Sequence, residues 1–226
     1  MPEQRSDDRH GHTGIRESND ATMTSQARQG LVLLIAGLFG LACATGESRP
    51  PVASQVGTPT DRFWGIIEHA RRGDAGCSRI ARRVTDTLAT LPPSAVEEFG
   101  HELSLRMAET YRWDLWAVAY VANGGESDDG FDYFRGWLIT RGRTRYEEAL
   151  RDPPAAVVGA SRVLSFFPLE CEEMLNVAEA AYQEVAHKPL PQWTHVAWPK
   201  EPLGKPWREE TIDQVYPGLT ARVERR

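Results

Sequence analysis

The chain has 226 residues, of which 41% are hydrophobic and 26% are charged. This length and apolar content suffice for one well-cored domain with extensions. The net charge is −6 at pH 7 and no cluster of lysine or arginine dominates, so the composition argues against a partner made of nucleic acid.

An uncharged apolar run lies between two polar segments near the start of the chain. Residues 1–30 are polar and lack hydrophobic periodicity, so we expect a disordered leader, within which Met23 is a candidate for the true start. Twelve apolar or small residues then precede Cys43. A helix needs roughly 20 residues to span a bilayer, so this run is too short to do so comfortably. Residues 31–43 instead resemble a bacterial lipoprotein signal that ends in a lipobox-like sequence.

Such a signal predicts that Cys43 becomes an acylated N-terminus and that the membrane is a partner through this lipid anchor. Residues 44–60, which contain several prolines and glycines, then form a flexible tether. The expected location is the bacterial cell envelope, facing the periplasm. The alternatives are that the run is a buried helix or an uncleaved membrane anchor, or that the protein is cytoplasmic.

Apolar residues at helical spacing predict an all-α fold, with a single compact multi-helix domain over residues 61–187 and no alternating strand pattern. Thr60 is expected to cap the first helix, and Ser94 with Glu97 to form a capping box on the third. The predicted helices cover residues 60–72, 77–91, 94–111, 113–122, a stretch from Asp128, 144–150, 155–165 and 168–187, the last being the longest.

Residues 188–226 are expected to hold an irregular segment rich in proline and tryptophan, followed by a short helix at 209–215. Residues 188–207, which we call the strap, contain five prolines. A wholly solvated segment would not favour tryptophan, so Trp193, Trp198 and Trp207 are expected to pin the strap across the helices.

Aromatic, acidic and glycine residues are most dense between Asn123 and Gly142, which we call the signature stretch. Gly124 and Gly125 stop the preceding helix, and Ser127 is expected to cap a new one that begins at Asp128. Its apolar face is expected to pack on the core; it carries Phe131, Phe134 and Leu138.

Several segments resemble the bacterial domain of unknown function 4240 family. They are Trp-Asp-Leu-Trp-Ala-Val-Ala-Tyr at 113–120, Gly-Gly-Glu-Ser-Asp-Asp-Gly-Phe-Asp-Tyr-Phe-Arg-Gly-Trp-Leu-Ile at 124–139, and the pairs Phe63-Trp64, Gly142-Arg143, Tyr146-Glu147 and Asp152-Pro153. The resemblance covers residues 61–153, with a possible extension to Ala186, and implies a fold, but no reaction, cofactor or catalytic residue. The long N-terminal extension departs from the family pattern.

Cysteine and histidine offer few options for a site. In an oxidising compartment Cys77 and Cys171 either form a disulfide or remain two buried thiols, and the sequence leaves both options open. The histidines are scattered, without the spacing of a zinc site, so we predict no metal and no cofactor.

The candidate site lies on a second face of the signature helix, where Asp132 can pair with Arg135 one turn later. A plainer interpretation is that the first acids complement the helix dipole and that the ion pair is solvated. The full set of candidate residues is Glu126, Asp128, Asp129, Asp132, Tyr133, Arg135 and Trp137.

These residues support two hypotheses about function. The first is an envelope-anchored binding or interaction domain, in which the acids and aromatic side chains edge a groove. The second is a hydrolase-type enzyme that uses Asp128, Asp129 or Asp132 as a base or metal ligand. A third, purely structural interpretation is that the signature stretch only holds the helices together.

Overall fold

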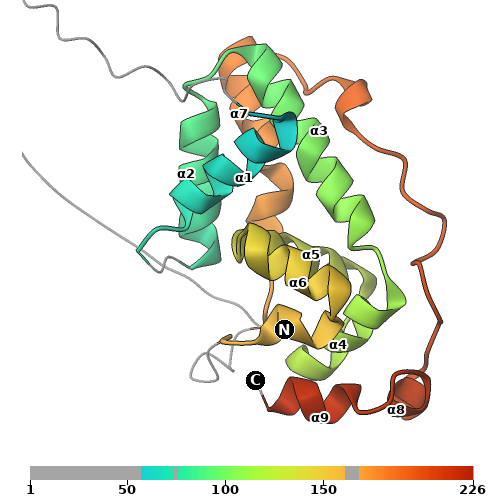
Figure 1. Ribbon diagram of the computed structural model, residues 1–226. Helices are drawn as coiled ribbons and strands as arrows, with labels where there is room; N and C mark the ends of the chain where they lie inside the picture. The colour runs from blue at the N-terminus through green and yellow to red at the C-terminus, as the bar shows by residue number, and fades with distance from the viewer. Residues whose placement is uncertain (1–56, 74–75, 161–167, 226) are drawn as a thin grey trace, which may run out of the picture. The chain divides into compact units, whose positions relative to one another are not determined.

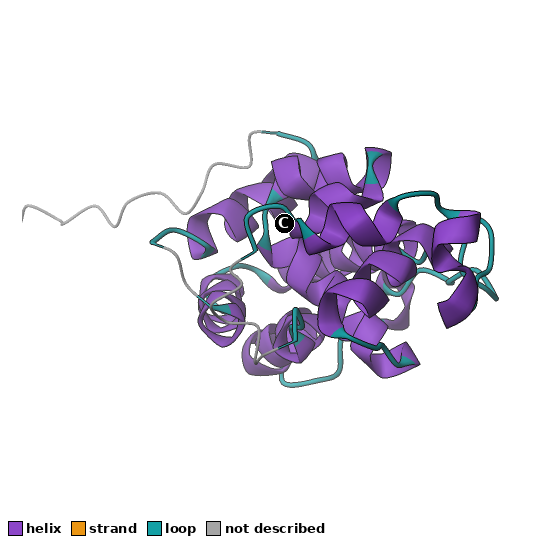
Figure 2. Ribbon diagram, turned by 90° about the horizontal axis from the view of Figure 1, so that it is seen from below, coloured by secondary structure: helices purple, strands orange, loops and turns teal. Residues whose placement is uncertain are grey.

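The computed structural model describes residues 57–73, 76–160 and 168–225. Within these ranges the chain forms helices and irregular segments but no strand, so the predicted all-α fold is confirmed (Figures 1 and 2). Among the described residues no helix is both long enough and apolar enough to cross a bilayer. The predicted leader, the apolar run with Cys43, and the tether up to residue 56 lie outside the described residues.

The longest helix is α3, and most others have nine to thirteen residues. In chain order the elements are α1 (Pro59–Ala70), α2 (Cys77–Leu88), α3 (Pro93–Glu109), α4 (Trp113–Asn123), α5 (Asp128–Thr140), α6 (Arg143–Arg151), the 3-10 helix η1 (Pro153–Val157), η3 (Glu172–Asn176), α7 (Val177–Ala186), η4 (Gln192–Thr194), η5 (Glu209–Thr211), α8 (Ile212–Val215) and α9 (Leu219–Glu224).

Two helices begin earlier than the sequence predicts, because a proline occupies the first turn of each. The cap of α1 is Thr58 and not Thr60: the Thr58 hydroxyl accepts from the Asp61 backbone N–H, and the Asp61 carboxylate accepts from Thr58 in return. Helix α3 starts at Pro93, so the predicted Ser94 cap is wrong. Proline suits a first turn because its missing N–H has no helical partner there.

The region after α6 differs most from the prediction. The helix expected at 155–165 is a 3-10 turn that ends at Val157, and residues 161–167 lie outside the described residues. The helix expected at 168–187 begins only at Glu172, as the 3-10 turn η3 that continues into α7. Cys171 is not helical, with φ −151° and ψ 78°, and its N–H donates to the Tyr133 carbonyl of α5. This tertiary bond replaces the first turn of the expected helix.

The core lies between α1, α2, α3, α5 and α7, which contact one another directly (Figure 1). Helix α7 packs against both α2 and α3, and α1 covers the same pair. The largest fully buried apolar side chains come from these helices and from α4, α6 and η3, which pack against them: Phe63, Ile67, Leu88, Leu115, Phe131, Phe134, Leu138, Ile139, Tyr146, Met174 and Tyr182.

The strap runs along α3 toward the start of α4 (Figure 1). Its backbone is tied down at Val196, whose N–H donates to Ser104 Oγ at 2.8 Å, and at Leu203, whose N–H donates to the Tyr111 carbonyl at 2.9 Å. The Trp207 indole then donates to the Trp113 carbonyl at 2.7 Å. After the strap, α9 contacts α4 and is a helix that the sequence did not predict.

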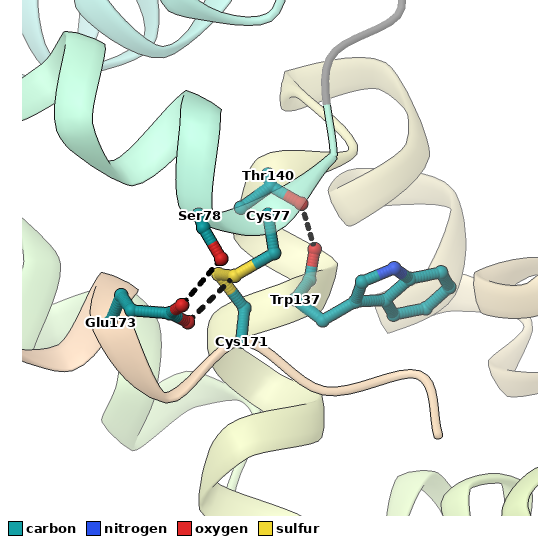
Figure 3. The surroundings of a disulfide bond; sticks show 6 residues. All are labelled: Cys77, Ser78, Trp137, Thr140, Cys171 and Glu173. Atoms are coloured by element: carbon teal, nitrogen blue, oxygen red, sulfur yellow. Dashed lines mark hydrogen bonds between the residues drawn. A yellow bond between two sulfur atoms is a disulfide. The ribbon is translucent and has the colours of Figure 1, made fainter. Parts of the chain in front are cut away.

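A disulfide joins Cys77 at the start of α2 to Cys171 just before η3, with their Cα atoms 5.5 Å apart (Figure 3). The sequence left open whether these cysteines form a disulfide or remain two buried thiols, and in the structure they form the disulfide. Beside it, Ser78 Oγ donates to Glu173. The bond fixes the segment before α7 between α2 and α5, because Cys171 also donates its N–H to α5.

Replacing both cysteines, Cys77→Ser with Cys171→Ser, should lower the free energy of unfolding by about 4 kcal/mol, because the bond closes a loop of many residues in the unfolded chain. The sequence separation is 94. Urea denaturation with and without a thiol reductant measures the effect. The reductant should shift the midpoint of the wild type and leave that of the double variant in place; equal midpoints for the wild type in both conditions would contradict the bond.

Candidate functional site

The signature helix α5 begins as the sequence predicts. Ser127 is the N-cap, and its hydroxyl accepts from the Gly130 N–H at 3.1 Å. Asp128 and Asp129 follow in the first turn and are exposed. There they lie near the positive end of the helix dipole. Neither forms an ion pair within the described ranges, so both carboxylates face solvent.

Arg135 is buried, with no solvent-exposed surface. Its guanidinium carbon lies 4.3 Å from the ring centre of Trp198 in the strap and 5.0 Å from those of Tyr111 and Phe131. One terminal nitrogen donates to the Met107 carbonyl at 2.6 Å, and the other donates to the Asp132 carboxylate. We call this arrangement the Arg135 box.

The prediction that Arg135 edges an open groove is therefore wrong. Helical spacing placed it on the face of Asp132, but the end of α3 and the strap cover that face. Burial lowers the pKa of the guanidinium, and the Asp132 charge opposes this shift. The Nε atom is buried with no hydrogen-bond partner in the described part of the chain. Three aromatic faces surround the cation and partly replace its lost hydration.

Three other candidate residues do come together. Tyr133 is half-buried and lies among the carboxylates of Asp129, Asp132 and Glu172. The charge of Glu172 is the largest cause of a raised Tyr133 pKa, followed by burial and the charge of Asp129. We call Asp128, Asp129, Asp132, Tyr133 and Glu172 the acidic face. It carries four acids and one phenol, and Asp132 is paired with Arg135, which lies inside the protein.

Glu172 was not among the predicted candidates, because it lies thirty residues beyond Gly142, the end of the signature stretch. The bond from the Cys171 N–H to the Tyr133 carbonyl, 2.9 Å long, brings it to α5. The disulfide at Cys171 holds the same segment. No local pattern reveals such a contact; the only sequence signal was the pair of cysteines, whose bonding the sequence left open.

Glu126 is half-buried just before α5, and Asn123 donates to its carboxylate at 2.6 Å. Desolvation raises the pKa of Glu126 to about 7; the Asn123 hydrogen bond opposes this shift, and the nearby charge of Glu170 adds to it. Within the candidate set it is the carboxyl whose proton exchanges near neutral pH. It lies next to the acidic face but is not fully accessible.

Trp137 lies further along α5 than the acids. Its ring packs 5.4 Å from Phe134, and the Arg141 guanidinium carbon lies 5.3 Å from its centre. In Figure 3 the indole of Trp137 points away from the disulfide. The ring contacts of Trp137 within the described residues are with Phe134 and Arg141, so its expected grouping with the carboxylates stays a prediction.

Three residues that could serve as metal ligands lie together at the disulfide: the potential ligand atoms of Cys77, Cys171 and Glu173 are within 4.8 Å of one another. The two sulfur atoms are bonded to each other, so they offer no thiolates to a metal ion. The hollow next to it is about 450 Å³ in volume and lies between α2 and the η3–α7 segment. Its lining includes none of the seven candidate residues.

A family model described as protein of unknown function, DUF4240, matches residues 59–184. The chain belongs to this family. The match begins at the first residue of α1 and ends within α7, so the family domain is the helical core without the strap. No curated protein and no solved structure was found to match the chain.

Membership in DUF4240 brings a fold but no chemistry, so the function has to be argued from the geometry. The Arg135 box can hold three elements together but cannot reach a ligand. The acidic face can attract a cation. Glu126 can exchange a proton near neutral pH.

The first test concerns the Arg135 box. Replacing Arg135 by lysine should lower the free energy of unfolding by about 2–3 kcal/mol, because one ammonium cannot reach both Met107 and Asp132 while covering three rings. Urea denaturation measures this. The exposed Asp129→Asn is the control, expected within about 0.5 kcal/mol of the wild type. A lysine variant as stable as this control would show that the box contributes little.

The second test uses pH. The folded pKa of Glu126, about 7, exceeds the ordinary value of 4.5, so folding favours the protonated form. Its contribution to stability is complete below pH 4.5 and is lost as the pH rises through 7. Glu126→Gln stays neutral and should lose less thermal stability than the wild type between pH 5 and pH 8. Glu184→Gln, at an exposed position, is the control. If the thermal stability of Glu126→Gln falls with pH as steeply as that of the control, the pKa of Glu126 is not raised.

Proposed function

We propose that the protein is a lipid-anchored interaction domain of the bacterial envelope that binds a cationic group of a partner at its acidic face. The observation that carries this proposal is the gathering of Asp129, Asp132 and Glu172 around Tyr133 on one surface. Carboxylates around an aromatic ring provide both charge and a flat apolar contact for an amine or guanidinium.

Two observations support the envelope location. A disulfide joins Cys77 and Cys171, and such bonds persist in oxidising compartments. The apolar run before Cys43 has the length and the ending of a lipoprotein signal. Neither observation depends on the other, because one comes from the folded domain and the other from the sequence ahead of it.

The acidic face suits binding better than catalysis. Asp128 and Asp129 are exposed, and Asp132 is already paired with Arg135. A general base or metal ligand works best where water is excluded and its pKa is tuned. A surface of exposed carboxylates instead steers and selects partners by charge.

An enzyme that acts through Glu126 is the second candidate function. A carboxyl with a pKa of about 7 is poised to exchange protons at neutral pH. In this hypothesis Glu126 is the catalytic acid or base, in place of Asp128, Asp129 or Asp132. A hydrolytic activity that Glu126→Gln abolishes without unfolding the protein would favour it over binding.

The binding proposal is tested with an oligolysine peptide as the probe and the full chain carrying Cys43→Ser, so that no lipid interferes. Isothermal titration measures the affinity. Asp129→Asn with Glu172→Gln should weaken it by roughly tenfold, since two exposed charge pairs contribute about 0.7 kcal/mol each.

The matched control is Asp86→Asn with Glu184→Gln, which removes two exposed carboxylates elsewhere. It should change the affinity by no more than about twofold, an effect of net charge alone. An equal loss in both double variants would show that the peptide follows net charge and not the acidic face.

A further inference from the structure

The strap combines exposed tryptophan and leucine with lysine. Trp193 and Leu203 are each 56% exposed and Trp198 is 40% exposed, although large apolar side chains are usually covered. Every lysine of the chain lies in the same segment, at positions 188, 200 and 205. All three are exposed.

The charge of the strap is opposite to that of the chain. Three lysines and one acid, Glu201, give it a net positive charge, whereas the whole chain carries −6. The lysines form no ion pair within the described residues. The strap therefore carries a local positive charge on a negatively charged chain.

The strap presents these side chains from a fixed backbone. The Val196 N–H is hydrogen-bonded to Ser104 of α3, and the Leu203 backbone is hydrogen-bonded to the backbones of Tyr111 and Trp113. The Trp207 indole donates to the Trp113 carbonyl at 2.7 Å. Five prolines further restrict its backbone. Exposure of Trp193 and Leu203 is therefore built into the fold, and little order has to be gained when a partner is bound.

We propose that the outer side of the strap docks on an anionic phospholipid surface. Tryptophan and lysine together are typical of the headgroup region, where the indole sits at the interface and the ammonium meets lipid phosphate. Protein interfaces also favour tryptophan but are depleted in lysine, so the combination favours a bilayer over a protein partner.

This inference rests on the proposed envelope location, which puts a membrane within reach. Thirteen residues, 44–56, lie between Cys43 and Gly57. A chain of that length spans at most about 50 Å, so the anchor keeps the domain near the bilayer surface. A weak attraction suffices under these conditions, because the anchor raises the effective concentration of lipid.

The test is vesicle co-sedimentation of the full chain carrying Cys43→Ser, with phosphatidylcholine alone and with phosphatidylcholine mixed with phosphatidylglycerol. The apolar run before residue 43 can contribute to binding, but it is uncharged and should not distinguish the two lipids. The protein should partition more strongly onto the anionic vesicles, and added salt should remove the difference.

Lys200→Gln with Lys205→Gln should reduce partitioning onto anionic vesicles by roughly tenfold. The matched control is Arg79→Gln with Arg82→Gln, which removes two exposed cations from α2. It should change partitioning by about twofold or less. Trp193→Ser with Leu203→Ser should weaken partitioning as well, and Trp198 is left in place because it covers Arg135.

Equal losses in the lysine and arginine variants would overturn the proposal, because net charge would then explain the binding. Binding that no strap substitution changes would also overturn it and would leave the strap as a surface for a protein. Membrane fractionation of a Cys43→Ser variant in cells separates this from the proposed anchor: unchanged retention would contradict acylation at Cys43, whereas the vesicle result does not depend on an acyl chain.

Discussion

A single buried cation constrains how α3, α5 and the strap are arranged. Moving a guanidinium out of water costs several kcal/mol, and partners repay this only when they are in place together. For Arg135 these partners are the Met107 carbonyl from α3, Asp132 from its own helix and the Trp198 ring from the strap. If one element shifted, the charge would remain buried with fewer contacts. The three elements are therefore coupled although they are distant in sequence.

Several residues of the signature stretch accordingly have structural roles in α5. Ser127 caps it, and Gly136 lets the chain at Cys171 approach, because a Cβ there would lie 2.6 Å from the Cys171 carbonyl oxygen. Arg135 forms the box. The residues left over, Asp128 and Asp129, are exposed.

The sequence predicted local structure well and tertiary structure poorly. The start of α5, its Ser127 cap and its buried Phe131 and Phe134 followed from spacing and capping chemistry. Errors arose where distant segments decide the outcome. A helix was expected to begin at residue 168, but Cys171 is not helical and its N–H is hydrogen-bonded to the Tyr133 carbonyl of α5. Arg135 looked like a surface residue because helical periodicity says nothing about what covers a polar face.

The same limit applies to the strap, where three tryptophans looked alike in sequence and differ in the fold. Trp207 is hydrogen-bonded to α4 and Trp198 covers Arg135, so both pin the segment. Trp193 packs its ring against His101 and remains 56% exposed. One segment therefore closes the box with its inner side and presents apolar and cationic groups on its outer side. A partner that binds the outer side would stabilise the strap in this position by mass action. Because Trp198 covers Arg135, it would also stabilise the packing around the buried guanidinium.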